Sequence, residues 1–175
     1  MKKLIFLFVV MIAAASCSSV KVSHDFDKTA NFSSYKTYTF TENALAIPLD
    51  DLNRRRILNA IETELTAKGF SKTDNNPDVL IDVNIKAEQK QTATATSSGG
   101  YGRYGWRGGY GTTTINYDSY VDGTMFIDMI DAVKKELVWE GRGTKTVEPD
   151  ASQQKRESNI NYAVKQIFMY YPPKF

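Results

Sequence analysis

The alternation of apolar and polar residues from Val79 to Ala87 limits the possible folds more than any other feature of this chain. The odd positions are apolar, whereas Asp82, Asn84 and Lys86 take the even positions from residue 82 onward. Successive side chains of a strand point to opposite faces, so this segment predicts a strand with one apolar face. A sheet built from such strands is covered on one side only.

Two segments show helical periodicity instead. Apolar residues recur at helical spacing in Leu52–Lys68, with Asp50 in front as an N-cap and Gly69 behind at the C-cap position. A second helical pattern lies within Asp150–Tyr171 and ends at Pro172, which cannot continue a helix. Both segments are long enough to cover the apolar face of a sheet.

The remaining ordered segments are expected to be strands joined by turns. In chain order, the expected strands are Val20–Val22, Tyr35–Phe40, Val79–Ala87, Thr112–Val121, Thr124–Ile130 and Leu137–Val147. Hydrophobic residues make up 42% of the 175 residues and charged residues 24%, which excludes a disordered or polytopic membrane chain. The predicted fold is a single α+β domain: a two-layer sandwich with a mainly antiparallel sheet of about five to six strands and two helices on one face.

The chain begins with a segment typical of an export signal. Met1-Lys2-Lys3 carries two positive charges, and the next 12 residues, Leu4–Ala15, are all apolar or small. A membrane-spanning helix needs roughly 20 apolar residues, so this run is too short to cross a bilayer and has the length of a signal-peptide core. We expect residues 1–16 to be removed and residues 17–175 to form the mature protein.

Two cleavage patterns overlap at the end of this leader. Ala13-Ala14-Ala15 fits ordinary signal peptidase, whereas Ala14-Ala15-Ser16-Cys17 is similar to a lipobox with Ala where Leu is usual. Cys17 is the only cysteine, which excludes an intramolecular disulfide, and a free thiol is a liability in an oxidising compartment. We therefore predict that Cys17 is lipidated: its sulfur takes a diacylglyceryl group, the chain is cut before it, and its new amino group is acylated.

Residues 91–111 predict a flexible loop rich in Gly and aromatic residues. Arg and aromatic residues between glycines would suggest RNA binding in a cytosolic protein, but the leader directs the chain elsewhere. One interpretation is a mobile arm without a ligand. The other is a contact site for an envelope protein, a glycan or the membrane interface. Its candidate contact residues are Tyr101, Tyr104, Trp106 and Tyr110.

The sequence contains no complete catalytic motif. His24 is the only histidine, and no Gly-x-Ser-x-Gly motif occurs. A hydrolase of envelope glycans would draw an acid pair from Asp118, Asp122 and Asp128, provided that two of them face one cleft at about 5–9.5 Å. The segment around them lacks the spacing of a calcium loop. We predict no metal, no cofactor and no enzymatic activity, with glycan binding or hydrolysis as the alternative.

A series of short motifs runs along the mature chain: Val20-Lys21-Val22 with Asp25, Phe32–Tyr38, Leu65–Phe70, Pro77–Ile81, Gly123–Asp128 with Asp131, Lys135–Gly141 and Tyr171-Pro172-Pro173. The order and spacing of these motifs resemble bacterial envelope lipoproteins with the domain of unknown function 4136. The resemblance implies an envelope lipoprotein of Gram-negative bacteria, and no activity or catalytic residue comes with it.

These observations define the expected function. We expect a non-enzymatic protein held at the outer membrane by the lipid on Cys17, with a binding or structural role and an envelope protein or glycan as partner. Acidic residues that some lipoproteins use for surface export are absent from Ser18–Val22, so the periplasmic face is expected. Without Lys2 and Lys3 the mature chain has 20 basic and 20 acidic residues. This neutral balance offers no argument for nucleic acid as a partner.

Overall fold

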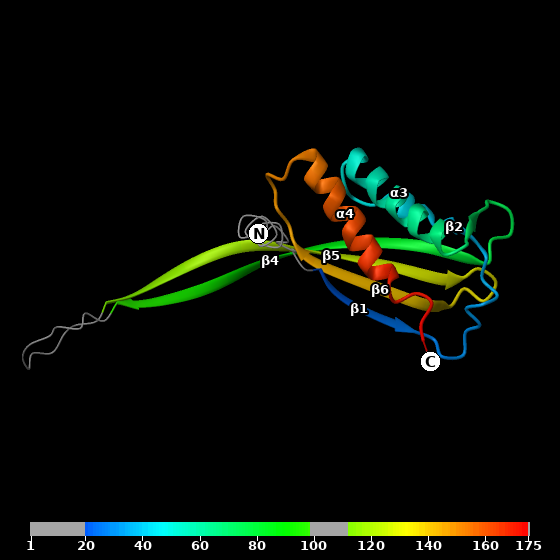
Figure 1. Ribbon diagram of the computed structural model, residues 1–175, viewed down its shortest axis with the longest axis horizontal. Helices are drawn as coiled ribbons and strands as arrows, with labels where there is room; N and C mark the ends of the chain where they lie inside the picture. Colours follow the sequence, from blue (N-terminus) through cyan, green and yellow to red (C-terminus); the bar gives the residue numbers. More distant parts are fainter. Residues whose placement is uncertain (1–19, 99–111, 175) are drawn as a thin grey trace, which may run out of the picture.

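The computed structural model describes residues 20–98 and 112–174, and these form an α+β fold. The strands are β1 (Lys21–Phe26), β2 (Thr37–Phe40), β3 (Ser71–Lys72), β4 (Val79–Ser98), β5 (Thr112–Asp131) and β6 (Leu137–Thr146). They make one sheet in the order β1-β6-β5-β4-β2-β3 (Figure 1). The pairs β1–β6, β6–β5 and β5–β4 are antiparallel, whereas β2 is parallel to both β4 and β3. The predicted α+β class and mainly antiparallel sheet are confirmed, although the sheet is mixed.

Two long helices lie on the same side of this sheet (Figure 1). They are α3 (Asp51–Ala67) and α4 (Gln153–Phe168), and a single turn, α2 (Glu42–Leu45), precedes them. The predicted caps are confirmed: the Asp50 carboxylate accepts a hydrogen bond from the Asn53 amide at 3.0 Å, and Gly69 has a φ of +86°. Among the residues that the structure describes, no helix has the length and apolar character needed to cross a bilayer.

The prediction of a loop over residues 91–111 is wrong for its first part. Strand β4 continues to Ser98 and pairs with β5 without interruption, from Val79–Asp131 to Ser98–Thr112. Beyond the last pairing with β6, the two strands leave the body as a two-stranded arm (Figure 1). Thr and other β-branched residues favour this extended ribbon. Residues 99–111 lie outside the described part of the chain.

The predicted break at Asp122-Gly123 is also wrong, because β5 is a single strand there. Gly123 serves close packing rather than a turn: a Cβ at this position would lie 3.0 Å from Cγ2 of Val147. Strand β1 is longer than predicted, since its pairing with β6 extends to Phe26 opposite Trp139. Helix α2 and the short strand β3 were not predicted.

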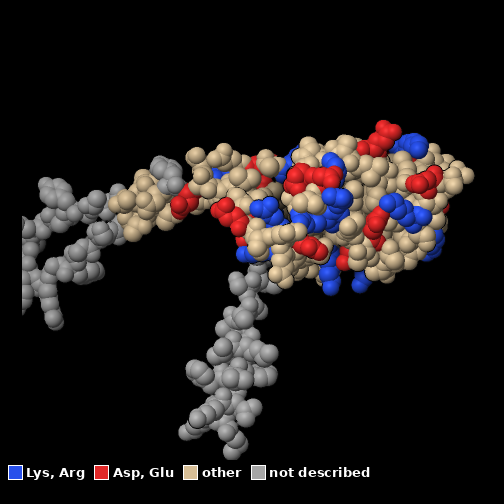
Figure 2. Space-filling view, turned by 90° about the horizontal axis from the view of Figure 1, so that it is seen from above, with Lys and Arg blue, Asp and Glu red and all other residues tan. Residues whose placement is uncertain are grey.

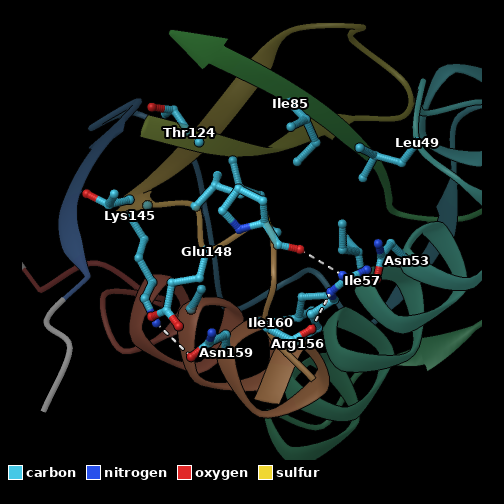
Figure 3. A pocket seen from close by; sticks show the side chains of 18 residues that line it. Leu49, Asn53, Ile57, Ile85, Thr124, Lys145, Glu148, Arg156, Asn159 and Ile160 are labelled. Carbon is cyan, nitrogen blue, oxygen red and sulfur yellow. Dashed lines mark hydrogen bonds between the residues drawn. The ribbon is translucent and has the colours of Figure 1, made fainter. Parts of the chain in front are cut away.

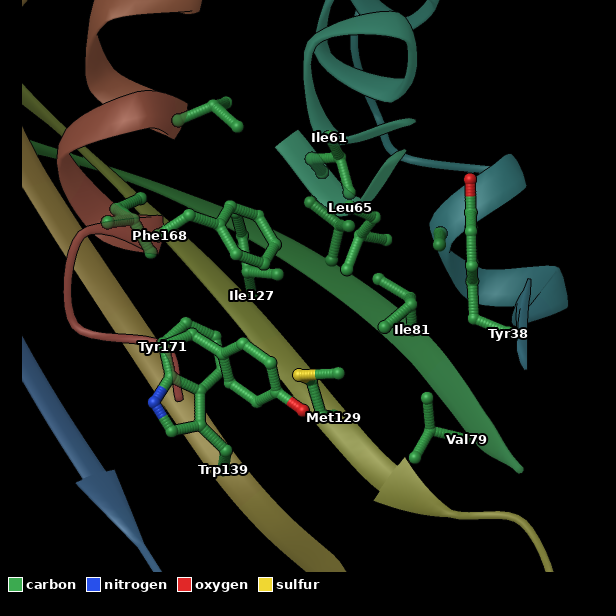
Figure 4. Packing of buried hydrophobic residues seen from close by; sticks show 14 of the residues in the cluster. Tyr38, Ile61, Leu65, Val79, Ile81, Ile127, Met129, Trp139, Phe168 and Tyr171 are labelled. Atoms are coloured by element: carbon green, nitrogen blue, oxygen red, sulfur yellow. The ribbon is translucent and has the colours of Figure 1, made fainter. Parts of the chain in front are cut away.

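The hydrophobic core lies between the two helices and the sheet (Figure 4). The predicted apolar face of β4 is buried, with exposed fractions of 0 to 1% at Val79, Ile81 and Val83. Trp139 of β6 is completely buried, and its ring centroid lies 5.7 Å from that of Phe168 and 5.4 Å from that of Tyr171. The core therefore joins β6, the C-terminal end of α4 and the segment that follows it.

Candidate functional site

An open apolar pocket of about 370 Å³ lies where the N-terminal halves of α3 and α4 face the sheet (Figure 3). Its apolar wall is formed by Leu49, Ile57, Ile85, Met125, Ile160 and Ala163. Ile85 and Ile160 continue the buried faces of β4 and α4, yet both are only partly buried against the core. The volume falls near the lower end of small-molecule sites, which span roughly 300–1,000 Å³.

Polar side chains fix the segment that borders this pocket between β6 and α4. The Arg156 guanidinium donates to the carbonyl oxygens of Pro149 at 2.9 Å and Ala151 at 3.0 Å. Lys145 donates from Nζ to Oδ1 of Asn159 at 2.6 Å, which joins β6 to α4 across the pocket wall (Figure 3). These contacts hold the pocket in shape with its polar groups at the edge.

The chemistry of the pocket is that of a binding site for an apolar group. Glu148 is the one carboxylate among its described lining residues, and it pairs with Lys155 at 2.6 Å. The hydrogen bond from Lys155 lowers the pKa of Glu148 below its usual value. A carboxylate held in its charged form by an ammonium is poorly suited to donate a proton as a general acid.

A row of carboxylates crosses the opposite face of the sheet. Asp82, Asp128 and Glu140 stand opposite one another on β4, β5 and β6, and Asp25 of β1 pairs in register with Glu140. Burial first, and then the charges of Glu140 and Asp82, raise the pKa of Asp128 to about 6, while Arg142 acts in the opposite direction. Oδ1 of Asp128 is buried and has no hydrogen-bond partner among the described residues. Like charges in one row disfavour ionisation of the most buried member.

The sequence did not reveal this row, because it depends on strand register. It predicted that Asp82 lies on the polar face of its strand, but not which residues stand opposite. Asp82 accepts hydrogen bonds from Thr41, which directly follows β2, and from Asn43 of α2. Across the described ranges, no three His, Cys, Asp or Glu side chains are placed to hold a metal ion.

The three carboxylates considered for glycan hydrolysis do not form a pair. Asp118 and Asp122 are four residues apart on β5, and Asp128 lies a further six residues along, which corresponds to about 13 and 20 Å in a strand. Both spacings exceed the roughly 5–9.5 Å of a glycosidase pair. The Asp122 carboxylate instead accepts hydrogen bonds from Lys90 and Thr146, each at 2.9 Å.

Asp131 is the last residue of β5, at the start of the turn that leads to β6. It accepts hydrogen bonds from the amides of Val133 and Lys134 and from the Tyr35 hydroxyl at 3.0 Å. His24 is exposed and stacks on Tyr170, with ring centroids 4.7 Å apart. The predicted lipidation site Cys17 and the candidate contacts Tyr101, Tyr104, Trp106 and Tyr110 lie outside the described residues.

Replacing Asp128 by Asn is expected to stabilise the protein above pH 7 by about 1 kcal/mol, a value reduced from full linkage because the side chain is partly exposed. The folded-state pKa of about 6 exceeds the unfolded value near 3.9, so the folded chain retains a proton that the unfolded chain has lost. Stability of the wild type therefore falls as pH rises from about 4 to 6. Urea unfolding at pH 4 and pH 8 measures this difference.

The exposed Asp118 of the arm supplies the matched control for this prediction. Asp118→Asn should leave unfolding unchanged at both pH values. The increase in the free energy of unfolding caused by Asp128→Asn should be present at pH 8 and nearly absent at pH 4. An equal gain in stability at both pH values would contradict the raised pKa of Asp128.

Comparison with known proteins gives a family and several similar structures. Residues 22–173 match the family described as a domain of unknown function, DUF4136. No curated protein matches the chain. A PDZ domain protein from Parabacteroides distasonis is similar at 18% identity with a TM-score of 0.55, covering 95% of this chain and 40% of that protein. The chain thus spans less than half the length of this relative, and the similarity concerns the fold alone.

A second similarity is weaker. A PelC dodecamer from Paraburkholderia phytofirmans has 11% identity and a TM-score of 0.44, with 86% of this chain and 95% of that chain covered.

Proposed function

Because the chain belongs to the DUF4136 family, which is described without an activity, we propose from its leader, its lone cysteine and its fold that it is a lipid-anchored, non-enzymatic envelope protein. In this proposal the lipid on Cys17 holds the domain at the periplasmic face of the outer membrane. The domain serves there as a binding or structural module. The position of Cys17 carries the proposal: it is the only cysteine, and it directly follows the predicted export leader.

The start of the fold supports a short tether. Strand β1 begins at Lys21, which pairs with Thr144 of β6, and Val20 is the first described residue. Three residue steps join Cys17 to Val20, a reach of about 10 Å when extended. Each acyl methylene buried in the bilayer contributes about 0.8 kcal/mol, and two or more chains anchor a protein stably. The lipid would therefore hold the body of the domain close to the headgroups.

We treat the fold as the predicted two-layer sandwich, in which α3 and α4 form one layer and the sheet the other. Figure 2 shows basic and acidic side chains interspersed over the body in the view from above. The outer part of the arm carries few charges in the same view. This pattern favours anchoring by lipid over attraction of a charged surface.

The test of the anchor is metabolic labelling with a palmitate analogue, followed by detergent phase partitioning. The wild type is expected to take up label and to enter the detergent phase, since it carries acyl chains. Cys17→Ala should do neither. A wild type that takes up no label, like Cys17→Ala, would defeat the proposal.

The arm favours a second candidate function, contact with an envelope protein or glycan. Ser98 and Thr112 pair at its end, about 30 Å beyond the last pairing with β6. They flank the segment with Tyr104 and Trp106. Replacing both aromatic residues by Ala is expected to lower retention on envelope fractions at least several-fold with an unchanged melting temperature. Unchanged retention would reject this candidate.

A further inference from the structure

The pocket described above lies beside the point where the chain enters the fold. Gly143 of β6 lines the pocket, and a Cβ at this position would lie 3.3 Å from Cγ1 of Val20. Lys21 pairs with Thr144, next to Lys145 and the other pocket residues of β6. The first described residue therefore lies beside the pocket wall, on the face of the sheet that the helices cover.

Cys17 is within reach of this wall. Three extended residue steps cover about 10 Å, so the Cα atom of Cys17 lies no farther than about 10 Å from that of Val20. The pocket walls are apolar on all three sides, with Ile57 from α3, Ile160 from α4 and Ile85 from β4. Its polar groups, Lys145 and Asn159 among them, stand at the edge (Figure 3). An apolar chain that ends in polar ester or amide groups matches this distribution.

We propose that the pocket binds one of the acyl chains carried by Cys17. The inference rests on the proposed lipid anchor. A short tether gives a linked group a millimolar effective concentration, which favours the chain on Cys17 over an acyl chain from the surrounding membrane. A triacylated cysteine keeps two chains for the bilayer when one is docked, so anchoring is retained. Docking would also fix how the body stands on the membrane, because the pocket lies at the arm end of the helices.

The test places a photoreactive group on the lipid itself. Cells that produce the full-length protein are fed a diazirine fatty acid, and the purified protein is irradiated, digested and analysed by mass spectrometry. Adducts between the lipidated N-terminal peptide and peptides with Ile85, Met125 or Ile160 are expected. Label on Cys17 without adducts in these peptides would overturn the inference and leave the proposed anchor standing. A wild type without label would reject the anchor and the inference together.

Two matched variants test the pocket as the site. Ala163→Trp fills the pocket from α4 and is expected to lower the adducts at least fivefold, with labelling of Cys17 unchanged. Asn161→Trp places the same ring on an exposed position of the same helix and should leave them unchanged. Ile160→Trp serves if Ala163→Trp fails to fold by circular dichroism. Equal adducts in the filled and control variants would overturn the assignment to this pocket.

A third arm distinguishes the source of the chain. Cys17→Ala is mixed with vesicles of phosphatidylethanolamine that contain a diazirine phospholipid, and then irradiated. Pocket adducts are expected at less than one tenth of the wild-type intramolecular yield. The vesicle lipid is not tethered to this variant, so its effective concentration at the pocket is lower than that of a chain carried by Cys17. A yield equal to the wild type would show a pocket for membrane phospholipid and would overturn the choice of Cys17.

Discussion

Replacing Trp139 by Ala is expected to lower the free energy of unfolding by about 3–5 kcal/mol. The Trp139 side chain is completely buried, and it stacks on Phe168 and meets Tyr171 edge to face. Its removal leaves a cavity between β6 and the C-terminal end of α4 that the surrounding backbone cannot fill. Urea unfolding measures the loss, and a domain of this size should melt roughly 10 °C lower.

Two controls separate this loss of packing from other effects. Nε1 of Trp139 has no hydrogen-bond partner among the described residues, so Trp139→Phe removes volume without breaking such a bond. Trp139→Phe should lower the free energy of unfolding by about 1–2 kcal/mol. Tyr170→Ala removes an aromatic ring that is 44% exposed and should cost less than about 1 kcal/mol. A Trp139→Ala variant no weaker than Tyr170→Ala would contradict the described core.

Local patterns predicted the parts of the fold that depend on local physics. Alternation along Val79–Ala87 identified the buried face of β4, because period two directly reports which side of a strand is covered. The limits of α3 followed from Asp50 and Gly69, since an N-cap and a left-handed C-terminal residue are local requirements. Both features depend only on residues that are close together in the sequence.

Features that depend on distant partners were missed. The Thr-rich continuation of β4 was predicted as a loop because it has no alternation of large apolar residues. Its backbone pairs with β5, a partner that the local sequence does not reveal. The parallel pairing of β2 with β4 carries no local signal. The row of Asp82, Asp128 and Glu140 depends on the register of three strands, which a single sequence does not specify.

The candidate site was less predictable than the fold. The pocket is assembled from α3, α4, β4, β5 and β6, and its residues carry no motif, because apolar side chains at periodic positions look like ordinary core residues. Ile85 and Ile160 differ from true core residues only in remaining partly exposed. The sequence did mark Cys17 through its chemistry, and β1, which begins at Lys21, pairs with β6 beside the residues of the pocket.

Replacing Gly141 by Val is expected to destabilise the domain by about 3 kcal/mol. A Cβ at Gly141 would lie 2.4 Å from Cγ2 of Ile167 and 2.5 Å from Cη2 of Trp139, and both neighbours are completely buried. Neither can move aside without opening the core, so α4 must shift away from β6. Chemical denaturation with circular dichroism detection measures the loss of stability.

The neighbouring Gly143 shows why this cost is steric. A Cβ at Gly143 would meet Cδ1 of Ile167 at 2.9 Å, and this atom is the far end of a flexible side chain. Gly143→Ala should therefore cost about 1 kcal/mol, and Ile167→Val, which removes Cδ1, should recover part of it. The same Ile167→Val leaves Cγ2 in place and should not rescue Gly141→Val. Rescue of both variants, or of neither, would contradict the described contact of α4 with β6.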